Sequence, residues 1–206
     1  GCAYATLEGF LSAKGTERFG QLYCLFDNEE VGSGTRQGAM SSFLPDVLTR
    51  IGEALGLSAQ ARRQALAGSL LLSADNGHAV HPNFPEKADP ANKVYPNGGV
   101  VIKYSANQKY TTTGLTAGLF QAICQKAGVP VQVFANRADE PGGSTLGNIS
   151  GTQVALNTVD IGLPQLAMHS SYETAGSRDT AYLIEAAKVL YSGSFAGKGD
   201  GSYKIG

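Results

Sequence analysis

The hydrophobic positions along this chain follow two patterns: short continuous apolar runs, and longer stretches with a helical period. Apolar runs bounded by glycine or polar residues are typical of buried strands; they occur at 21–26, 69–74, 99–104, 131–135 and 158–163. Stretches that favour helices occur at 2–13, 42–55, 58–67, 113–127, 148–156 and 179–191. Strands that alternate with covering helices predict an α/β fold with a mixed, largely parallel sheet.

Two segments lie outside this alternation. The stretch 81–99 is polar, has no periodicity and contains four prolines, which is long for a connection within a compact domain and typical of a functional or mobile loop. The glycine-rich end, 193–206, is expected to be a flexible tail. The sequence therefore predicts one main domain over 1–192, followed by that tail.

Composition narrows the class of protein. Of 206 residues 42% are hydrophobic, enough for a sizeable core, and 16 Lys+Arg against 17 Asp+Glu leave a net charge of −1. A balanced charge argues against nucleic acid as a partner, because phosphate binding needs a basic face. No apolar run approaches the ~20 residues of a membrane span, and no signal peptide opens the chain. Three cysteines without CxxC spacing fit a reducing compartment, so a cytoplasmic location is predicted.

Polar side chains that are suited to chemistry follow three of the predicted strands. The acidic stretch 27–30 follows the first strand, Asp75 follows the second, and His169 lies shortly after the strand at 158–163. Open α/β sheets bind ligands beyond the carboxyl ends of their strands. These residues are therefore expected to converge on one edge of the sheet.

The segment 27–38, DNEEVGSGTRQG, contains two adjacent carboxylates. One of Glu29 and Glu30 can bind a cation while the other reaches a metal-bound water, an arrangement that suits hydrolysis. The alternative is a solvated acidic turn, since charged residues are mostly exposed. A dinucleotide site at Gly32, Gly34 and Gly38 is disfavoured, because the spacing is not GxGxxG and the carboxylates would repel a pyrophosphate.

Histidines supply further candidate ligands. Asp75, His78 and His81 offer the oxygen and imidazole donors that suit zinc, but Pro82 disfavours the helix that would place both histidines on one face. Loop histidines bonded to backbone or water are the alternative. His169 alone is more typical of a core or rim residue, and it becomes a candidate ligand only together with Glu30 and Asp75.

Lys103 interrupts the apolar strand at 99–104. A buried ammonium is costly unless it meets an anion, so one interpretation is a pocket lysine that awaits a substrate carboxylate. The alternative is an edge strand that points the lysine at water. Tyr110 and the turn 141–147, PGGSTLG, could line the same pocket.

Five blocks of sequence together resemble the aspartyl aminopeptidases, the M18 family of metallopeptidases. They are 25–51, 73–84, 99–110, 141–147 and 159–176, and they span nearly the whole chain. The resemblance implies a zinc-aminopeptidase-like α/β fold that is incomplete on its N-terminal side. It implies a two-zinc aminopeptidase that hydrolyses N-terminal Asp or Glu from peptides and assembles as a homo-oligomer when full length.

The same resemblance assigns roles around the metals. It implies that Glu29 is the general base, that Glu30 and His169 bind one zinc, and that Asp75 binds the other.

It also implies the substrate contacts. Lys103 would pair with the acidic side chain of the substrate, with Tyr110 nearby. His78 and His81 match histidines of a family block and are retained as candidate substrate-binding residues without a defined role.

The chain departs from the family pattern at its beginning. Family members have a histidine ligand far upstream and a metal-bridging aspartate directly before the helix that matches 2–10, and neither is present. We therefore expect a C-terminal part of the catalytic domain with weak or absent zinc and little activity by itself. A related two-metal hydrolase with a different amide specificity, and a non-catalytic peptide-binding descendant, remain the alternatives; retention of Glu29, Glu30, Asp75 and His169 argues against the second.

Overall fold

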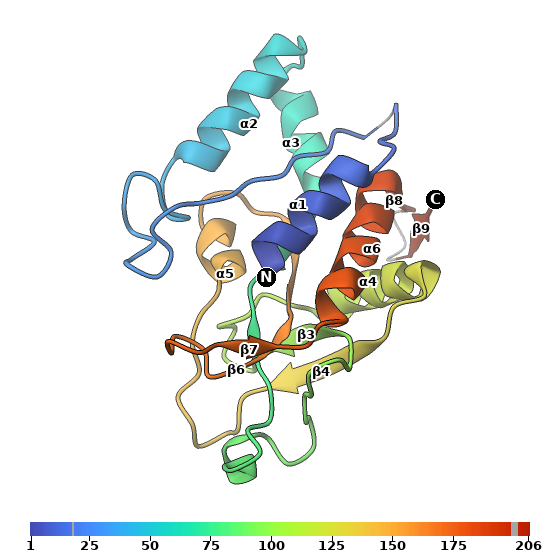
Figure 1. Ribbon diagram of the computed structural model, residues 1–206. Helices are drawn as coiled ribbons and strands as arrows, with labels where there is room; N and C mark the ends of the chain where they lie inside the picture. The colour runs from blue at the N-terminus through green and yellow to red at the C-terminus, as the bar shows by residue number, and fades with distance from the viewer. Residues whose placement is uncertain (18, 199–201) are drawn as a thin grey trace.

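The computed structural model describes residues 1–17, 19–198 and 202–206 (Figure 1). The helices are α1 (Cys2–Ser12), α2 (Phe43–Ala54), α3 (Ala59–Ala67), α4 (Gly114–Ala127), α5 (Leu146–Gly151) and α6 (Asp179–Ser192), with a short 3-10 helix at Pro85–Lys87. The strands are β1 (Leu70–Ala74), β2 (Gly77–His78), β3 (Val100–Tyr104), β4 (Val131–Ala135), β5 (Asn157–Gly162), β6 (Pro164–Leu166), β7 (Thr174–Ala175), β8 (Phe195–Gly197) and β9 (Tyr203–Ile205).

The main sheet has the strand order β1-β5-β3-β4. Strand β1 is parallel to β5 and β3 is parallel to β4, whereas β3 and β5 are antiparallel. The predicted mixed, largely parallel sheet with covering helices is therefore confirmed. The two parallel pairs run in opposite directions. In the main sheet, therefore, the carboxyl ends of β1 and β5 point toward the edge where the candidate site lies, and those of β3 and β4 point the other way.

The hydrophobic core forms where α1, α4 and α6 cover the central strands (Figure 1). Val100, Ile102, Val159 and Ile161 on β3 and β5 are fully buried, which is why these strands read as continuous apolar runs. Helix α1 packs closely on α6. A side chain at Gly9 would place its Cβ 2.5 Å from the Cβ of Ala187, so only glycine permits this helix spacing.

A second, smaller sheet extends the ends of β1 and β5. Strand β2 follows β1 and pairs in parallel with β6, which follows β5, and β7 closes this sheet in antiparallel fashion. These strands have only two or three residues. Strands of this length cannot be recognised from an alternating sequence pattern. The pairing of β2 with β6 nevertheless brings the segment that follows Asp75 next to the segment that precedes His169.

The predicted strand at 21–26 is wrong. In the described part of the chain these residues form no ladder with another strand, and Leu22 and Leu25 are 40% and 65% exposed. The physical reason is the absence of a neighbour: a groove separates this segment from β1, the edge strand of the main sheet. An apolar run predicts burial, but a strand also needs a partner for its backbone groups.

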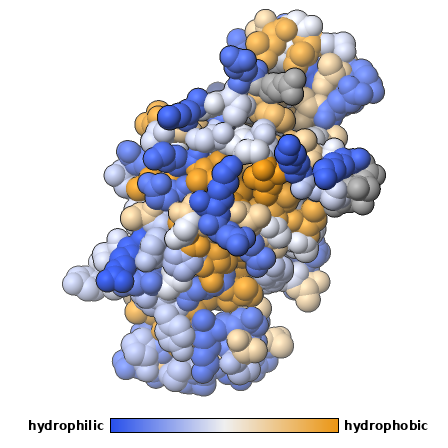
Figure 2. All heavy atoms as spheres, turned by 90° about the vertical axis from the view of Figure 1, so that its right-hand side faces the viewer, coloured by the Kyte–Doolittle hydropathy of each residue, from blue (hydrophilic) through white to orange (hydrophobic). Residues whose placement is uncertain are grey.

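Helices α2 and α3 project from the body of the molecule (Figure 1). The helix predicted at 42–55 is confirmed, but of its apolar face only Leu44 is fully buried, and Phe43, Ile51 and Leu55 are 50%, 42% and 70% exposed. Figure 2 shows hydrophobic side chains at this projecting end as well as across the middle of the face turned to the viewer. The amphipathic pattern thus fixed the helix without guaranteeing a surface to cover it.

At the end of the chain, β8 and β9 form an antiparallel pair within the predicted tail 193–206. Residues 199–201 lie outside the described residues, and the flexibility of the tail stays a prediction. Among the described residues, no helix has both the length and the apolar character needed to cross a membrane.

Candidate active site

Glu30 and His169 form the first pair of candidate residues that lie in contact. Glu30 lies in the turn after 21–26 and His169 in the loop between β6 and β7, yet the Nε2 of His169 is 3.1 Å from a carboxylate oxygen of Glu30. Two donors that each bind zinc at about 2.0–2.1 Å with tetrahedral angles lie about 3.3 Å apart. The spacing and the donor types therefore fit two ligands of one zinc ion.

The turns that carry these two residues each contain unusual backbone. His169 itself has φ +65° and Asn28, two residues before Glu30, has φ +62°, both in the left-handed region that L side chains rarely adopt. The His169 amide donates a 2.7 Å hydrogen bond to the Glu173 carboxylate. Non-glycine residues held in this conformation are concentrated at functional sites, which supports a role for these two turns.

Asp75 and Lys103 form the second pair. Lys103 lies on β3, between β5 and β4, and its side chain is only 2% exposed, so the edge-strand alternative is excluded. Its Nζ donates to the carbonyl of Asn76 at 2.8 Å and lies 3.5 Å from Oδ2 of Asp75. The ammonium is thus buried beside one carbonyl and one carboxylate, within reach of the candidate metal ligand Asp75.

Tyr110 lies beside this lysine, as expected for two residues of one pocket. The Lys103 Nζ is 5.5 Å from the centre of the Tyr110 ring, close enough for a cation–π interaction. The ring is buried against Phe134, and its hydroxyl accepts a long hydrogen bond from Asn136 at 3.5 Å. Lys103 and Tyr110 are therefore neighbouring side chains.

Glu29 lies in the electric field of both pairs. Partial burial raises its pKa, the negative charges of Glu30 and Asp75 raise it further, and His169 and Lys103 oppose them. A carboxylate whose pKa is raised accepts protons more readily, which is what a general base near neutral pH requires. All five groups therefore share one neighbourhood.

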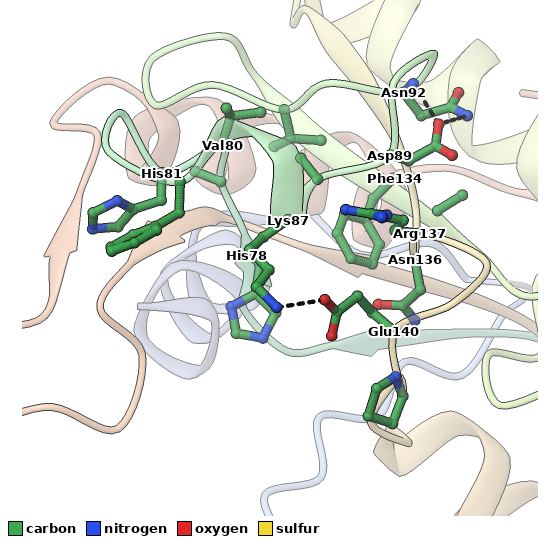
Figure 3. A pocket seen from close by; sticks show the side chains of 16 residues that line it. His78, Val80, His81, Lys87, Asp89, Asn92, Phe134, Asn136, Arg137 and Glu140 are labelled. Carbon is green, nitrogen blue, oxygen red and sulfur yellow. Dashed lines mark hydrogen bonds and ion pairs between the residues drawn. The ribbon is translucent and has the colours of Figure 1, made fainter.

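His78 also lies in this neighbourhood, whereas His81 contacts Asn83 and Phe84 in its own loop. Desolvation and the positive charges of Lys103 and His169 lower the pKa of His78. His81 packs against Phe84 at a ring distance of 5.3 Å. Figure 3 shows the two histidines at the wall of an adjoining cavity of about 290 Å³ under the 81–94 loop, in which Lys87 and Glu140 pair at 2.6 Å.

Within the described residues, no three His, Cys, Asp or Glu side chains converge as a group that could hold a metal ion. Glu30 faces His169, while Asp75 faces Lys103. The structure thus brings the predicted ligands together as two neighbouring pairs rather than as one closed cage.

Asp160 is a residue that the sequence analysis missed. It is fully buried on β5 and accepts hydrogen bonds from the amide and hydroxyl of Thr111, at 2.6 and 2.8 Å, and from the Thr145 hydroxyl at 2.7 Å. It therefore joins the segment after Tyr110 to the turn 141–147. The signal was available, because Asp160 is the single charge in the apolar run 158–163, just as Lys103 is in 99–104.

Known proteins resemble this chain in sequence and in structure. A family model described as aminopeptidase I zinc metalloprotease (M18) matches residues 1–191. A probable M18 family aminopeptidase 2 from Clostridium acetobutylicum is 46% identical over 189 residues, 92% of this chain and 43% of that protein. The crystal structure of prApe1 is similar with a TM-score of 0.82 at 30% identity, over 91% of this chain and 40% of that one. The S. cerevisiae mApe1 dodecamer is similar with a TM-score of 0.76 at 29% identity, over 91% and 42% of the two chains.

These matches also show how this chain compares with its relatives in length. The chain spans less than half the length of the Clostridium acetobutylicum protein and of both Ape1 chains.

Proposed function

This chain belongs to the M18 family of aminopeptidases, and we propose that its site serves the two-zinc hydrolysis of N-terminal Asp or Glu from peptides. The observation that supports this best is the 3.1 Å approach of Glu30 and His169, which are 139 positions apart in the sequence. A solvated acidic turn has no reason to meet an imidazole from a distant loop. Glu29 lies directly beside this pair.

In this proposal some side chains bind the metals and one transfers the proton. Glu30 and His169 hold one zinc and Asp75 holds the other. Zinc, when bound, polarises the scissile carbonyl and lowers the pKa of water. Glu29 accepts the proton of the attacking water and returns it to the leaving amine.

Specificity for acidic residues is proposed for Lys103 and Tyr110. A buried ammonium needs an anion, and the nearest one, Asp75, is also a metal ligand in this proposal. If Asp75 binds zinc, the Lys103 ammonium would be able to pair with a substrate carboxylate. Tyr110, whose ring lies 5.5 Å from the Lys103 Nζ, would flank that carboxylate.

The ligand set of this chain is partial. It offers two donors for one zinc and one for the other, so we propose that tight metal binding and turnover require further residues outside these 206. A metal site rarely keeps its affinity without its full ligand count.

The specificity is tested in a chimera, in which this chain replaces the 189 matching residues of the Clostridium acetobutylicum protein. We expect the chimera to cleave Asp- and Glu-anilides in preference to Leu- and Lys-anilides. A preference for Leu or Lys would identify a different amide specificity, and binding of peptides without cleavage of any substrate would identify a non-catalytic descendant.

The role of Glu29 is tested in the same chimera by Glu29→Gln. The amide keeps the size of the side chain but cannot accept the proton, so kcat should fall by 10²–10⁴-fold, the usual range for a lost general base, while zinc content stays unchanged. Glu53→Gln on α2 is the matched control and should leave kcat as it was. A Glu29→Gln variant with nearly normal kcat contradicts the assignment.

We further propose a homo-oligomer in the cytoplasm. The solved S. cerevisiae relative is a dodecamer, and all three cysteines of this chain are free thiols, which fits a reducing compartment.

A further inference from the structure

The ammonium of Lys103 is held most closely by the backbone of Asn76. Asn76 lies between β1 and β2, and its carbonyl oxygen accepts a hydrogen bond from the Lys103 Nζ at 2.8 Å. The Asp75 carboxylate is farther from the same nitrogen, at 3.5 Å. The direction of the Asn76 carbonyl therefore decides where the charged end of this lysine lies.

The side chain of Asn76 is hydrogen-bonded at both of its polar atoms. Its Oδ1 accepts from the thiol of Cys2 at 3.1 Å, and its Nδ2 donates to Oε1 of Gln165 at 2.5 Å. Cys2 begins α1 and Gln165 lies on β6, and both are buried. An amide can accept and donate at once, whereas an ionised carboxylate only accepts. Asparagine is therefore suited to link these two elements.

Two glycines leave room for the lysine to reach this carbonyl. A Cβ at Gly162 would lie 3.0 Å from Cε of Lys103, and a Cβ at Gly77 would lie 3.4 Å from the same atom. The end of the lysine stem thus passes close to the backbone of β2 and β5. Packing confines the stem, and the Asn76 carbonyl fixes the ammonium at its tip.

Folding alone gives no reason for the amide pair of Asn76 and Gln165. Replacement of two hydrogen-bonded partners by apolar groups of the same shape is often nearly neutral for stability. The effect that remains is on orientation, because the two side-chain contacts restrict rotation of the Asn76 backbone and hence of its carbonyl.

We propose that Asn76 is a positioning residue for substrate specificity. Held by Cys2 and Gln165, it aims its carbonyl at Lys103 and keeps the ammonium where a substrate carboxylate would meet it. Asn76 acts through Lys103 and contacts neither substrate nor metal. This inference rests on the proposed role of Lys103 in the recognition of acidic residues.

The test uses Asn76→Leu in the chimera, because leucine has a similar size and makes neither side-chain hydrogen bond. We expect kcat/KM for Asp-anilide to fall by about 3–10-fold, the usual worth of a neutral hydrogen bond. The loss should appear in KM, with kcat and zinc content unchanged, because it weakens binding of the substrate side chain. Leu-anilide should lose less. An equal loss for both substrates, or a loss confined to kcat, overturns the proposal.

The matched control is Asn157→Leu. It makes the same change at another half-buried asparagine, at the first residue of β5 and so at the end of that strand away from the site. The kinetic constants for both anilides should stay as they were. A shift of substrate preference in Asn157→Leu equal to that in Asn76→Leu contradicts a specific role for Asn76.

Gln165→Met removes the same contact from its other side. Gln165→Met and Asn76→Leu should cause similar losses, and the double variant should lose no more than Asn76→Leu alone, because both changes break one link. The double variant leaves no amide of this pair unpaired, so it carries the test if Asn76→Leu by itself does not fold. Losses that add in the double variant contradict the link.

A crystal structure of the variant chimera gives a readout that does not depend on activity. The distance between the Lys103 Nζ and the carbonyl oxygen of residue 76 should increase beyond about 3.5 Å, the limit of a hydrogen bond. An unchanged distance of 2.8 Å overturns the inference. A parent chimera without preference for Asp-anilide would contradict the proposed specificity of Lys103, and this distance would then decide the positioning role by itself.

Discussion

Lys103 shows how one residue depends on its strand. The strand β3 has a neighbour on each side, so its lysine cannot reach water and must find its partners inside the protein. It finds the Asn76 carbonyl and the Asp75 carboxylate. Since removal of one member of a buried charge pair leaves the other uncompensated, substitution of this residue should affect the site more than its size suggests.

We expect Lys103→Met in the chimera to lower kcat/KM for Asp-anilide by about 10–150-fold, which corresponds to the loss of about 1.5–3 kcal/mol for a hydrogen bond to a charged group. The rate for Leu-anilide should fall by a smaller factor, because that substrate has no carboxylate to recognise and loses only the contact between Lys103 and Asp75. Lys126→Met on α4 serves as the control. An equal loss for both substrates would mean that Lys103 supports the fold rather than the specificity.

Cys124 illustrates a buried group outside the site. Burial raises the pKa of its thiol from 9.0 to about 12. A raised pKa in the folded state means that the unfolded chain loses its proton first, so stability is lost as the pH rises above 9. At pH 10 the loss is about 1.4 kcal/mol relative to neutral pH.

Cys124→Ala should therefore lose less stability than the parent chain between pH 7 and pH 10, although its stability at neutral pH is lower because a buried side chain has been shortened. Urea denaturation at both pH values measures this difference. Parallel pH profiles for the two proteins would refute the effect of the thiol.

At the scale of elements, local sequence signals define both ends of α4. Thr113 and Thr116 form a reciprocal capping box at its start, and Gly128 ends it with φ +68°. These signals act on neighbouring backbone groups, so they operate wherever the helix is placed. The helix ends expected from the sequence and those of the structure accordingly agree within one residue.

Gly128→Ala should destabilise the protein by about 1 kcal/mol or more, because an L side chain is strained at positive φ. Gly114→Ala, at the first residue of the same helix, is the control. Neither position has an atom within 4 Å of an added Cβ, so backbone conformation is the relevant difference. Thermal unfolding should give a lower Tm for Gly128→Ala only, and equal Tm values would exclude backbone strain.

At the scale of the whole molecule, the candidate site collects groups from four separate parts of the chain. The turn after 21–26 contributes Glu30, the end of β1 contributes Asp75, β3 contributes Lys103 and the loop after β6 contributes His169. Within the described residues these groups meet in pairs, without a cage of three metal ligands. Metal affinity should therefore be a property of the longer protein.

After dialysis we expect the 206-residue chain to retain far less than one equivalent of zinc, and the chimera to retain two. His169→Ala in the chimera should remove one of them, because it takes away half of the pair with Glu30. Elemental analysis by mass spectrometry measures the zinc content. Two equivalents held tightly by the short chain would contradict the partial ligand set.

The sequence by itself determined the helices and the four strands of the main sheet, because hydrophobic periodicity and caps act between near neighbours in the chain. It also identified Lys103 as a candidate functional residue, because a charged side chain inside an apolar run needs a polar partner wherever the strand lies. Asp160 had the same signal, and its role could have been found in the same way.

Only the tertiary structure decided which of these elements meet. It placed Glu30 against His169, turned Asp75 toward Lys103, and reversed β3 relative to β5. In the described part of the chain it gave 21–26 no strand to pair with. Such contacts depend on how distant segments reverse, pair and pack, and on which neighbours are available. A local pattern can specify what a segment prefers to form, but pairing requires a second segment whose position no local pattern records.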